Sequence, residues 1–273
     1  MSALLPAGLL QGRHVFVSGG GSGVNLAIAR ACAGLGASIS ICGRTEGRLQ
    51  EAAAELRALG ADVAHAVADV RDAEAVQAAL TTAAAALGPV DGVVCGAAGS
   101  FLAPAERLSS NGFRAVMDID LLGAFHCAHA AFDQLRETRG ALLFVSGGQA
   151  VAPFQHQAHV SAAKAGVDAL MRSLAVEWGP VGIRANSILP GPVTGTEGMR
   201  RLTETAEPEV WAEMVPLGRF ADPAEVGRMA AVLLSPIASF VNGAVVTVDG
   251  GMALTGPQPF NRAVLAAAAQ EGR

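Results

Sequence analysis

The sequence contains no tyrosine, and its single lysine, Lys164, stands against eighteen arginines. The absence of tyrosine excludes every mechanism in which a tyrosine phenol gives or takes the proton. Charged residues make up only 16% of the 273 residues and aromatic residues 4%, which excludes a strongly charged, disordered chain. Because the composition favours arginine over lysine so strongly, position 164 is expected to need a property of an ammonium group that a guanidinium lacks.

Cysteine is also scarce, and the four cysteines (Cys32, Cys42, Cys95 and Cys127) contain no C-x-x-C spacing, which favours reduced thiols in a cytoplasm. The net charge of −5 argues against nucleic acid or an anionic membrane surface as the main partner. Mean hydropathy is +0.40, yet no apolar run reaches the roughly 18 residues of a membrane helix. No basic segment precedes the first apolar stretch, so a secretory signal is not expected. The composition predicts a soluble cytoplasmic protein.

What the sequence does contain is a regular alternation of short apolar runs and Ala-rich stretches of helical period. The runs predict seven strands, at 14–18, 38–42, 62–67, 90–95, 141–146, 183–189 and 244–248. Such alternation predicts right-handed crossovers and an α/β fold with a Rossmann-like, doubly wound parallel sheet, covered by helices on both faces. Because no Pro/Ser-rich linker interrupts the series, we expect one domain over residues 1–273.

The segment 190–222 breaks this alternation, since it is long, rich in Gly, Pro, Thr and Glu, and follows a predicted strand. Ligands of doubly wound sheets bind at the carboxyl ends of the strands, so a substrate lid is expected here, with an ordinary surface loop as the alternative. Arg200 and Arg201 in this lid could bind the phosphates of a coenzyme A substrate or remain solvated. The tail at 253–273 contains an Ala-rich stretch that either closes the lid or packs on a neighbouring subunit.

A glycine-rich turn, Ser18-Gly19-Gly20-Gly21-Ser22-Gly23-Val24-Asn25, follows the first strand and opens the first helix. Glycines let the backbone approach a pyrophosphate, and the helix N-terminus supplies free N–H groups. In this strand–turn–helix context the motif predicts a dinucleotide site, with a purely structural turn as the alternative. Asn25 stands where the last glycine of such a turn is expected, which affects either local packing or phosphate contacts.

Arg44, after Gly43 at the end of the second strand, stands where NAD-binding proteins have an acidic residue. A guanidinium suits a 2′-phosphate, and Arg48 lies one turn later, so NADP(H) is the predicted cofactor. The alternative is a solvated Arg44 at a helix start. Asp69 and Val70, just after the third strand, are expected to bracket the adenine.

These motifs, with Lys164, Pro190-Gly191 and Val248-Asp249-Gly250-Gly251, resemble the short-chain dehydrogenase/reductase family over about residues 10–255. Within it, AAGSFLAPAERLS (97–109), VMDIDLLGAF (116–125), LAVEWGPVGIRANS (174–187) and PGPVTGTEGMRRL (190–202) are most similar to 2,4-dienoyl-CoA reductases, especially the peroxisomal type. The resemblance implies NADPH-dependent reduction of a conjugated carbon–carbon double bond in an acyl-CoA thioester, in fatty acid metabolism, by a homotetramer or homodimer. It also implies cofactor contacts from Gly19, Gly21, Ser22, Gly23, Val24, Arg44, Asp69, Val70, Ala97, Lys164, Pro190, Gly191 and Val193.

Most members of this family use an Asn, a Ser, a Tyr and a Lys, with the Tyr four residues before the Lys. Here Val160 stands at the Tyr position and Gly147 at the Ser position, beside Ser146, while Asp120 replaces the Asn. Only Lys164 is kept, and the resemblance implies that its ammonium group binds the nicotinamide ribose. The chain is therefore not expected to be an ordinary alcohol dehydrogenase.

Reduction of a conjugated dienoyl thioester is compatible with the missing phenol. The thioester oxygen takes up the developing negative charge, and the proton reaches carbon from water or from a carboxylic acid. Asp120 is the candidate acid, and peroxisomal-type dienoyl-CoA reductases have the same Asp. A capping or salt-bridged Asp is the alternative, and Asp118 is expected to be structural.

His159, beside Val160, is a second candidate acid because imidazole titrates near neutrality, although a packed histidine is the alternative. Gln149 could bind a thioester carbonyl or be solvated. The spacings His126-x-x-His129 and His156-x-x-His159 resemble metal sites, but no Cys or carboxylate cluster completes them, so no metal is expected.

Three functions therefore stay open from the sequence. The first is the acyl-CoA reductase. The second is an NADP(H)-binding pseudoenzyme or sensor, suggested by Val160, Gly147, Asn25 and by Cys95-Gly96 in place of the family's paired Asn. The third is a carbonyl reductase that uses His159 or Asp120 as its acid.

Overall fold

The computed structural model describes residues 4–196 and 213–256, and its centre is a single seven-stranded sheet in which every strand pairing is parallel. The strand order is β3-β2-β1-β4-β5-β6-β7, which confirms the predicted doubly wound α/β fold. The strands are β1 (His14–Ser18), β2 (Ser38–Gly43), β3 (Val63–Val67), β4 (Gly92–Cys95), β5 (Ala141–Val145), β6 (Arg184–Pro190) and β7 (Val245–Val248).

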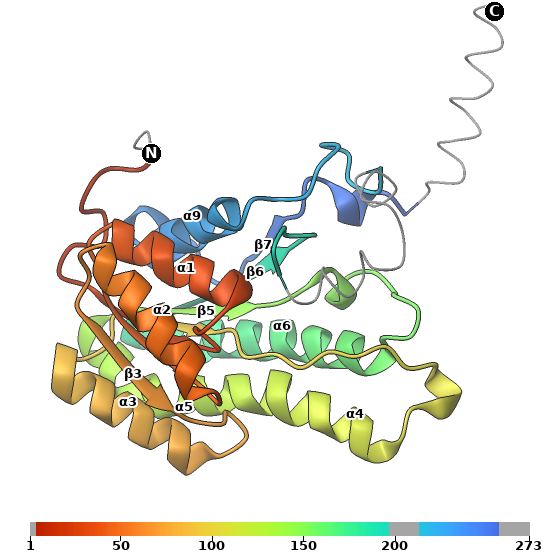
Figure 1. Cartoon of the computed structure of the whole chain (residues 1–273), viewed down its shortest axis with the longest axis horizontal. Coiled ribbons are helices and arrows are strands. Elements are labelled where there is room, and N and C mark those ends of the chain that lie inside the picture. The colour runs from red at the N-terminus through yellow and green to blue at the C-terminus, as the bar shows by residue number, and fades with distance from the viewer. Residues whose placement is uncertain (1–3, 197–212, 257–273) are drawn as a thin grey trace, which may run out of the picture.

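Helices cover both faces of this sheet, with α1, α2 and α9 on one face and α3, α5 and α6 on the other (Figure 1). The helices are α1 (Gly23–Gly34), α2 (Glu46–Ala58), α3 (Ala73–Leu87), α4 (Ser110–Val116), α5 (Gly123–Thr138), α6 (Ala158–Trp178) and α9 (Pro223–Leu234). A π-helical turn, η2 (Met117–Leu122), joins α4 to α5. Within the two described ranges, no helix combines the length and the apolar character that a membrane crossing requires.

The predicted strands lie where expected, but their ends differ by one or two residues. β4 begins at Gly92, because the Val90 N–H donates to the Gln134 side chain at 3.0 Å and does not enter the strand ladder. β6 runs one residue further than predicted, to Pro190, which pairs with Val248 of β7.

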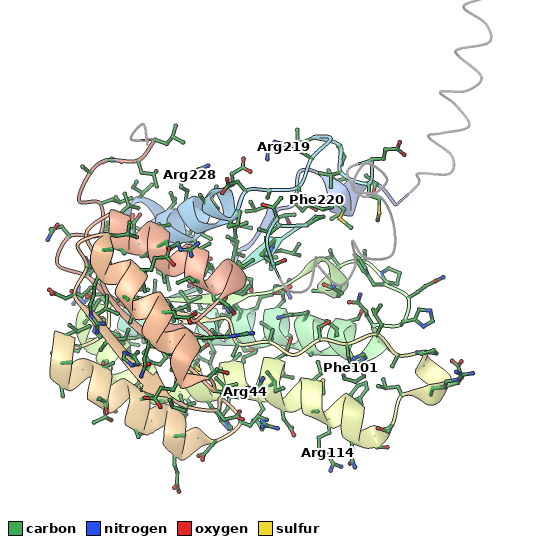
Figure 2. All side chains as sticks on the ribbon, viewed as in Figure 1. Arg44, Phe101, Arg114, Arg219, Phe220 and Arg228 are labelled. Atoms are coloured by element: carbon green, nitrogen blue, oxygen red, sulfur yellow. The ribbon has the colours of Figure 1, made fainter. Side chains whose placement is uncertain are left out.

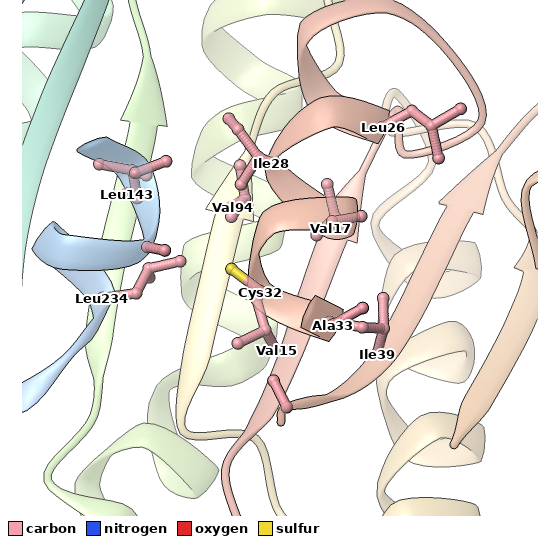
Figure 3. Close-up of a cluster of buried hydrophobic side chains, with 14 of the residues drawn as sticks. Val15, Val17, Leu26, Ile28, Cys32, Ala33, Ile39, Val94, Leu143 and Leu234 are labelled. Atoms are coloured by element: carbon pink, nitrogen blue, oxygen red, sulfur yellow. The ribbon is translucent and has the colours of Figure 1, made fainter. Parts of the chain in front are cut away.

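The alternation of side chains along β1 divides the interior into two cores. Val15 and Val17 pack toward α1 and α9, whereas Phe16 packs toward α3 and α5. Both faces of a parallel sheet are covered, so all five residues of β1 are buried. Figure 3 shows the first core, where Val15 and Val17 gather with Ile28, Cys32 and Leu234.

Small residues let the covering helices approach one another closely, which accounts for the abundance of Ala and Gly. Gly227 of α9 lies against α1, where an added Cβ would be 2.6 Å from the Ala27 carbonyl oxygen. A larger side chain at Gly227 would force the two helices apart.

The strand order reverses direction between β1 and β4, so the loops after these two strands lie at the topological switch point on the carboxyl edge of the sheet. The glycine turn follows β1, and Gly96 and Ala97 follow β4. Of the predicted lid, 190–196 and 213–222 are described, and Val193 forms a β-bridge with Ala221. Arg200, Arg201 and the tail from 257 onward lie outside the described residues.

Candidate functional site

The glycine turn after β1 leaves the N-terminus of α1 free to bind an anion. Gly19 has a φ of +69° and its N–H donates to the Cys42 carbonyl at 2.8 Å, which folds the turn back over β2. A Cβ at Gly20 would lie 2.6 Å from the Ile41 side chain, so glycine is required at position 20. The N-cap residue Ser22 makes no side-chain capping bond, and the first turn of α1 has no acidic residue. The first N–H groups of α1 are thus available to phosphate oxygens.

Arg44 lies at the end of β2, where Figure 2 marks it near the start of α2. Its side chain is exposed at the same carboxyl edge as the glycine turn. Asp69, one of the predicted adenine contacts, forms an ion pair with Arg71 at 2.6 Å. The hydrogen bond from Arg71 lowers the pKa of the Asp69 carboxyl, and the positive charges of Arg71 and Arg44 act in the same direction.

Lys164 of α6 and Asp120 of η2 meet beside the end of β5. The Lys164 ammonium lies 3.1 Å from Asp120 Oδ2 and donates to the Val145 carbonyl at 3.0 Å. Asp120 Oδ1 accepts the Gly99 N–H at 2.7 Å. The ammonium is hydrogen-bonded to the Val145 carbonyl, whereas the ion pair with Asp120 Oδ2 lacks hydrogen-bond geometry, so at least one of its three N–H groups is left for a ligand.

Both members of this ion pair are enclosed, with Asp120 2% and Lys164 8% exposed. The π-helical turn places Asp120 toward the interior, while Asp118 on the same turn is only half-buried. A buried ion pair is favourable only when its remaining polar atoms are bonded, and the Gly99 N–H and the Val145 carbonyl fulfil that role.

The two positions at which a tyrosine phenol and a serine hydroxyl were considered hold an apolar residue, Val160, and a glycine, Gly147. Val160, at the Tyr position, packs with Val116 and Ala163 in a small buried cluster. A Cβ at Gly147, the Ser position, would lie 2.7 Å from Gln149 Oε1, so a serine there would displace that side chain. The neighbouring Ser146 hydroxyl is buried and has no hydrogen-bond partner among the described residues.

His159 is fully enclosed, and its ring packs on Phe101 with 4.3 Å between the ring centroids. Burial lowers the pKa of His159 below its ordinary value of 6.5, against the raising effects of a Phe101 backbone contact and the Asp120 charge. The imidazole is therefore neutral at pH 7 and has no extra proton to donate, which disfavours His159 as the acid.

Replacement of His159 by leucine is expected to weaken the pH dependence of stability. Because the pKa of His159 is lower in the folded than in the unfolded protein, its protonation opposes folding, and stability falls as the pH drops below about 6.5. Thermal unfolding at about pH 7.5 and about pH 5.5 should show a larger fall in Tm for the wild type than for His159→Leu, by roughly 2–4 °C per kcal/mol lost. His14 has a lowered pKa in both proteins and serves as the internal control. Equal falls in Tm would show that His159 does not contribute.

The other residues predicted to bind the cofactor or the substrate differ in how much of each is left to contact a ligand. Gln149 donates to the Gln157 side chain at 2.8 Å, so one of its two amide N–H groups is already in use. Gly191 packs against Asp249, where an added Cβ would lie 2.6 Å from the Asp249 Cα, and the Asp249 carboxylate in turn accepts the N–H of Gly251 at 2.8 Å. Val193 is buried in the first core, which leaves only its backbone for a ligand.

A cavity of about 540 Å³ lies at the edge of the sheet opposite the glycine turn, and the residues that line it include Arg13, Arg184 and Phe240. We place the functional site at the carboxyl edge nevertheless, because the glycine turn and the Lys164–Asp120 pair both lie there.

Sequence reasoning missed the groups that hold the ion pair, the Gly99 N–H and the Val145 carbonyl. Both are backbone groups, so residue type carries no signal for them. The only available hint was the glycine of the AAGSF stretch.

Comparison with known proteins gives the same family from sequence and from structure. A family model described as enoyl-(acyl carrier protein) reductase matches residues 19–253. A peroxisomal 2,4-dienoyl-CoA reductase [(3E)-enoyl-CoA-producing] of Saccharomyces cerevisiae is 40% identical over 248 residues, which cover 89% of this chain and 85% of the yeast protein. A reductase of the same name from Rattus norvegicus is 38% identical over 257 residues, 93% of this chain and 88% of the rat protein.

Among solved structures, a gluconate 5-dehydrogenase from Burkholderia cenocepacia J2315 in complex with NADP and tartrate superposes with a TM-score of 0.84. It is 31% identical, and the match covers 89% of this chain and 96% of that one.

Proposed function

Because the chain belongs to the short-chain dehydrogenase/reductase family, whose members are oxidoreductases that bind a nicotinamide cofactor, we propose that it is an NADPH-dependent 2,4-dienoyl-CoA reductase. The observation that supports this most is the buried Lys164–Asp120 ion pair beside a site from which both the phenol and the serine hydroxyl are missing. Such a site suits the reduction of a conjugated double bond, which needs a stabilised oxyanion and a proton at carbon, and no acid at a carbonyl oxygen.

The residues at the carboxyl edge fit a dinucleotide. The uncapped N-terminus of α1 would bind the pyrophosphate, and Arg44 would bind the 2′-phosphate. A remaining N–H of the Lys164 ammonium would bind the ribose hydroxyls of the nicotinamide half.

NADPH bound by these residues would supply a hydride for the far end of the conjugated system of the substrate. The negative charge then develops on the thioester oxygen of the substrate, and the Lys164 ammonium is the nearby fixed positive charge. Asp120 does not reach solvent, so we assign it the role of holding the Lys164 ammonium group in place. The proton that completes the reduction comes from water.

The proposal is tested by loss of NADPH absorbance in the presence of a 2-trans,4-trans-dienoyl-CoA, with the saturated acyl-CoA and a simple ketone as controls. Turnover is expected with the dienoyl thioester alone. Turnover with the ketone would favour the carbonyl reductase. Tight NADPH binding without turnover of any substrate would favour the pseudoenzyme.

Replacement of Arg44 by aspartate is expected to reverse the cofactor preference. The change removes a charge-assisted contact to the 2′-phosphate and supplies an acceptor for a 2′-hydroxyl, so affinity for NADPH should fall by about 10- to 100-fold while affinity for NADH rises. Fluorescence titration with both cofactors measures the effect. Arg172→Asp, at an exposed position on α6, is the matched charge reversal and should leave the preference unchanged. An unaltered preference in Arg44→Asp would refute the assignment.

We further propose a homo-oligomer, supported by exposed apolar side chains on α5 and α6, among them Phe125 and Val176. The lid role of 190–222 and the cytoplasmic location remain predictions, and the yeast and rat relatives are named as peroxisomal proteins.

A further inference from the structure

Asn25 stands where the last glycine of the glycine turn is expected. Its side chain occupies space that is open because residue 96 is a glycine. Asn25, in the first turn of α1, donates from Nδ2 to the Gly96 carbonyl at 2.7 Å. An added Cβ at Gly96 would collide with Asn25 Oδ1 and lie 2.6 Å from Asn25 Cγ. A side chain at position 96 would therefore force the Asn25 carboxamide out of its present place.

The Asn25 carboxamide also lies close to Gly19, in the turn after β1. A Cβ at Gly19 would lie 2.9 Å from Asn25 Nδ2 and 3.0 Å from the Ala97 Cα. Asn25 thus fills a slot between the turn after β1 and the loop after β4. Its Oδ1 is buried without a partner among the described residues, so the amide is held by its one hydrogen bond and by close packing.

The loop that Asn25 holds leads directly to the ion pair. Ala97 and Gly96 are anchored by the hydroxyl of Ser18, which accepts the Gly96 N–H at 3.0 Å. Two residues beyond Ala97, the Gly99 N–H donates to Asp120 at 2.7 Å, and Asp120 in turn lies 3.1 Å from Lys164. A continuous series of contacts therefore connects the glycine turn after β1 to the Lys164 ammonium group.

We infer that Asn25 is a positioning residue that fixes the loop at 96–99 against the glycine turn, and that Gly96 lacks a side chain in order to receive it. Through this loop Asn25 sets the place of the Gly99 N–H and so of Asp120. The inference rests on the proposed function only for its kinetic readout, since the contact itself lies within the protein.

Reciprocal rescue tests the pair. Gly96→Ala is expected to lower the Tm and to weaken NADPH binding by about tenfold, because the new methyl group displaces the Asn25 amide. Asn25→Gly removes the amide, and Gly96→Ala should then be tolerated, so that the double variant is no worse than Asn25→Gly alone. Gly34→Ala, on the same helix with open space at its Cβ, and Asn111→Gly on α4 are the matched controls.

A kinetic measurement separates positioning from a general loss of structure. Asn25→Ala should lower kcat per NADPH-binding site by about tenfold and leave the KM for the dienoyl-CoA unchanged, since Asp120 is displaced while the acyl site is not. An unchanged kcat per binding site would show that Asn25 acts only on folding or on cofactor affinity.

Thermal unfolding of the variants without cofactor or substrate decides the structural part even if the chain proves inactive on dienoyl-CoA. Losses of Tm that add in the double variant would overturn the pairing of Asn25 with Gly96. A failure of the proposed function alone would leave the rescue in Tm intact.

Discussion

Lys164→Ala is expected to lower turnover of a dienoyl-CoA by about 10²- to 10³-fold, because in the proposed mechanism it removes a fixed positive charge beside the reacting thioester. NADPH binding should weaken as well, since the ammonium donor that is not used by Asp120 and Val145 is lost. The variant also leaves the Asp120 carboxylate buried without its counter-ion, which costs about 3–5 kcal/mol of stability. Initial rates, NADPH titration and thermal unfolding measure the three effects.

Two further variants keep the result interpretable where Lys164→Ala fails to fold. Lys164→Arg retains the charge, yet its planar fork does not fit a slot in which Lys164 is almost enclosed, so turnover should fall while the fold is kept. Lys164→Met with Asp120→Asn removes both charges and should recover most of the lost stability without recovering activity. Full activity of the double variant would exclude Lys164 from the reaction, whereas full activity of Lys164→Arg would show that a positive charge at this position is enough.

Asp120→Asn is expected to lower kcat by about 10- to 100-fold with little change in NADPH affinity. The amide oxygen still accepts the Gly99 N–H, so the loop keeps its place. What is lost is the negative charge that holds the Lys164 ammonium in place. Steady-state kinetics and cofactor titration of the same preparation separate the two quantities.

Asp118→Asn provides the matched control, because Asp118 lies on the same π-helical turn but outside the ion pair. It should leave kcat unaltered. If Asp120→Asn also leaves kcat unaltered, Asp120 has no part in the reaction, and the Lys164–Asp120 contact is only a structural one.

The fold was predictable because each strand is an apolar run in a regular βα series. β1 and β5 are buried on both faces, so β5 is wholly apolar and β1 has polar residues only at its two ends, His14 and Ser18, which distinguishes both from the amphipathic helices. The predicted strand ends were less accurate. At Val90, for example, the N–H donates to the Gln134 side chain of α5 and not to a neighbouring strand, and residue type does not reveal such a long-range bond.

The site was predictable only where a residue type has one dominant role. Lys164 was selected by composition and Asp120 by its place relative to a motif, but their pairing depends on a π-helical turn that has no periodic signature. The neutrality of His159 follows from burial beneath Phe101, a contact between segments far apart in the sequence. The fit of Asn25 over Gly96 depends in the same way on a close approach that spacing does not reveal.

The restriction of lysine to one enclosed position has a chemical consequence for a protein that is exposed to thioesters. Acyl-CoA thioesters transfer their acyl groups to free side-chain amines, and this chain has no such amine on its surface, because Lys164 is its only lysine and is 8% exposed. Its eighteen guanidinium groups give the surface positive charge without nucleophilicity. We therefore expect the side-chain amines of the protein to resist acylation by its proposed substrate, because such an adduct could form only at the enclosed Lys164.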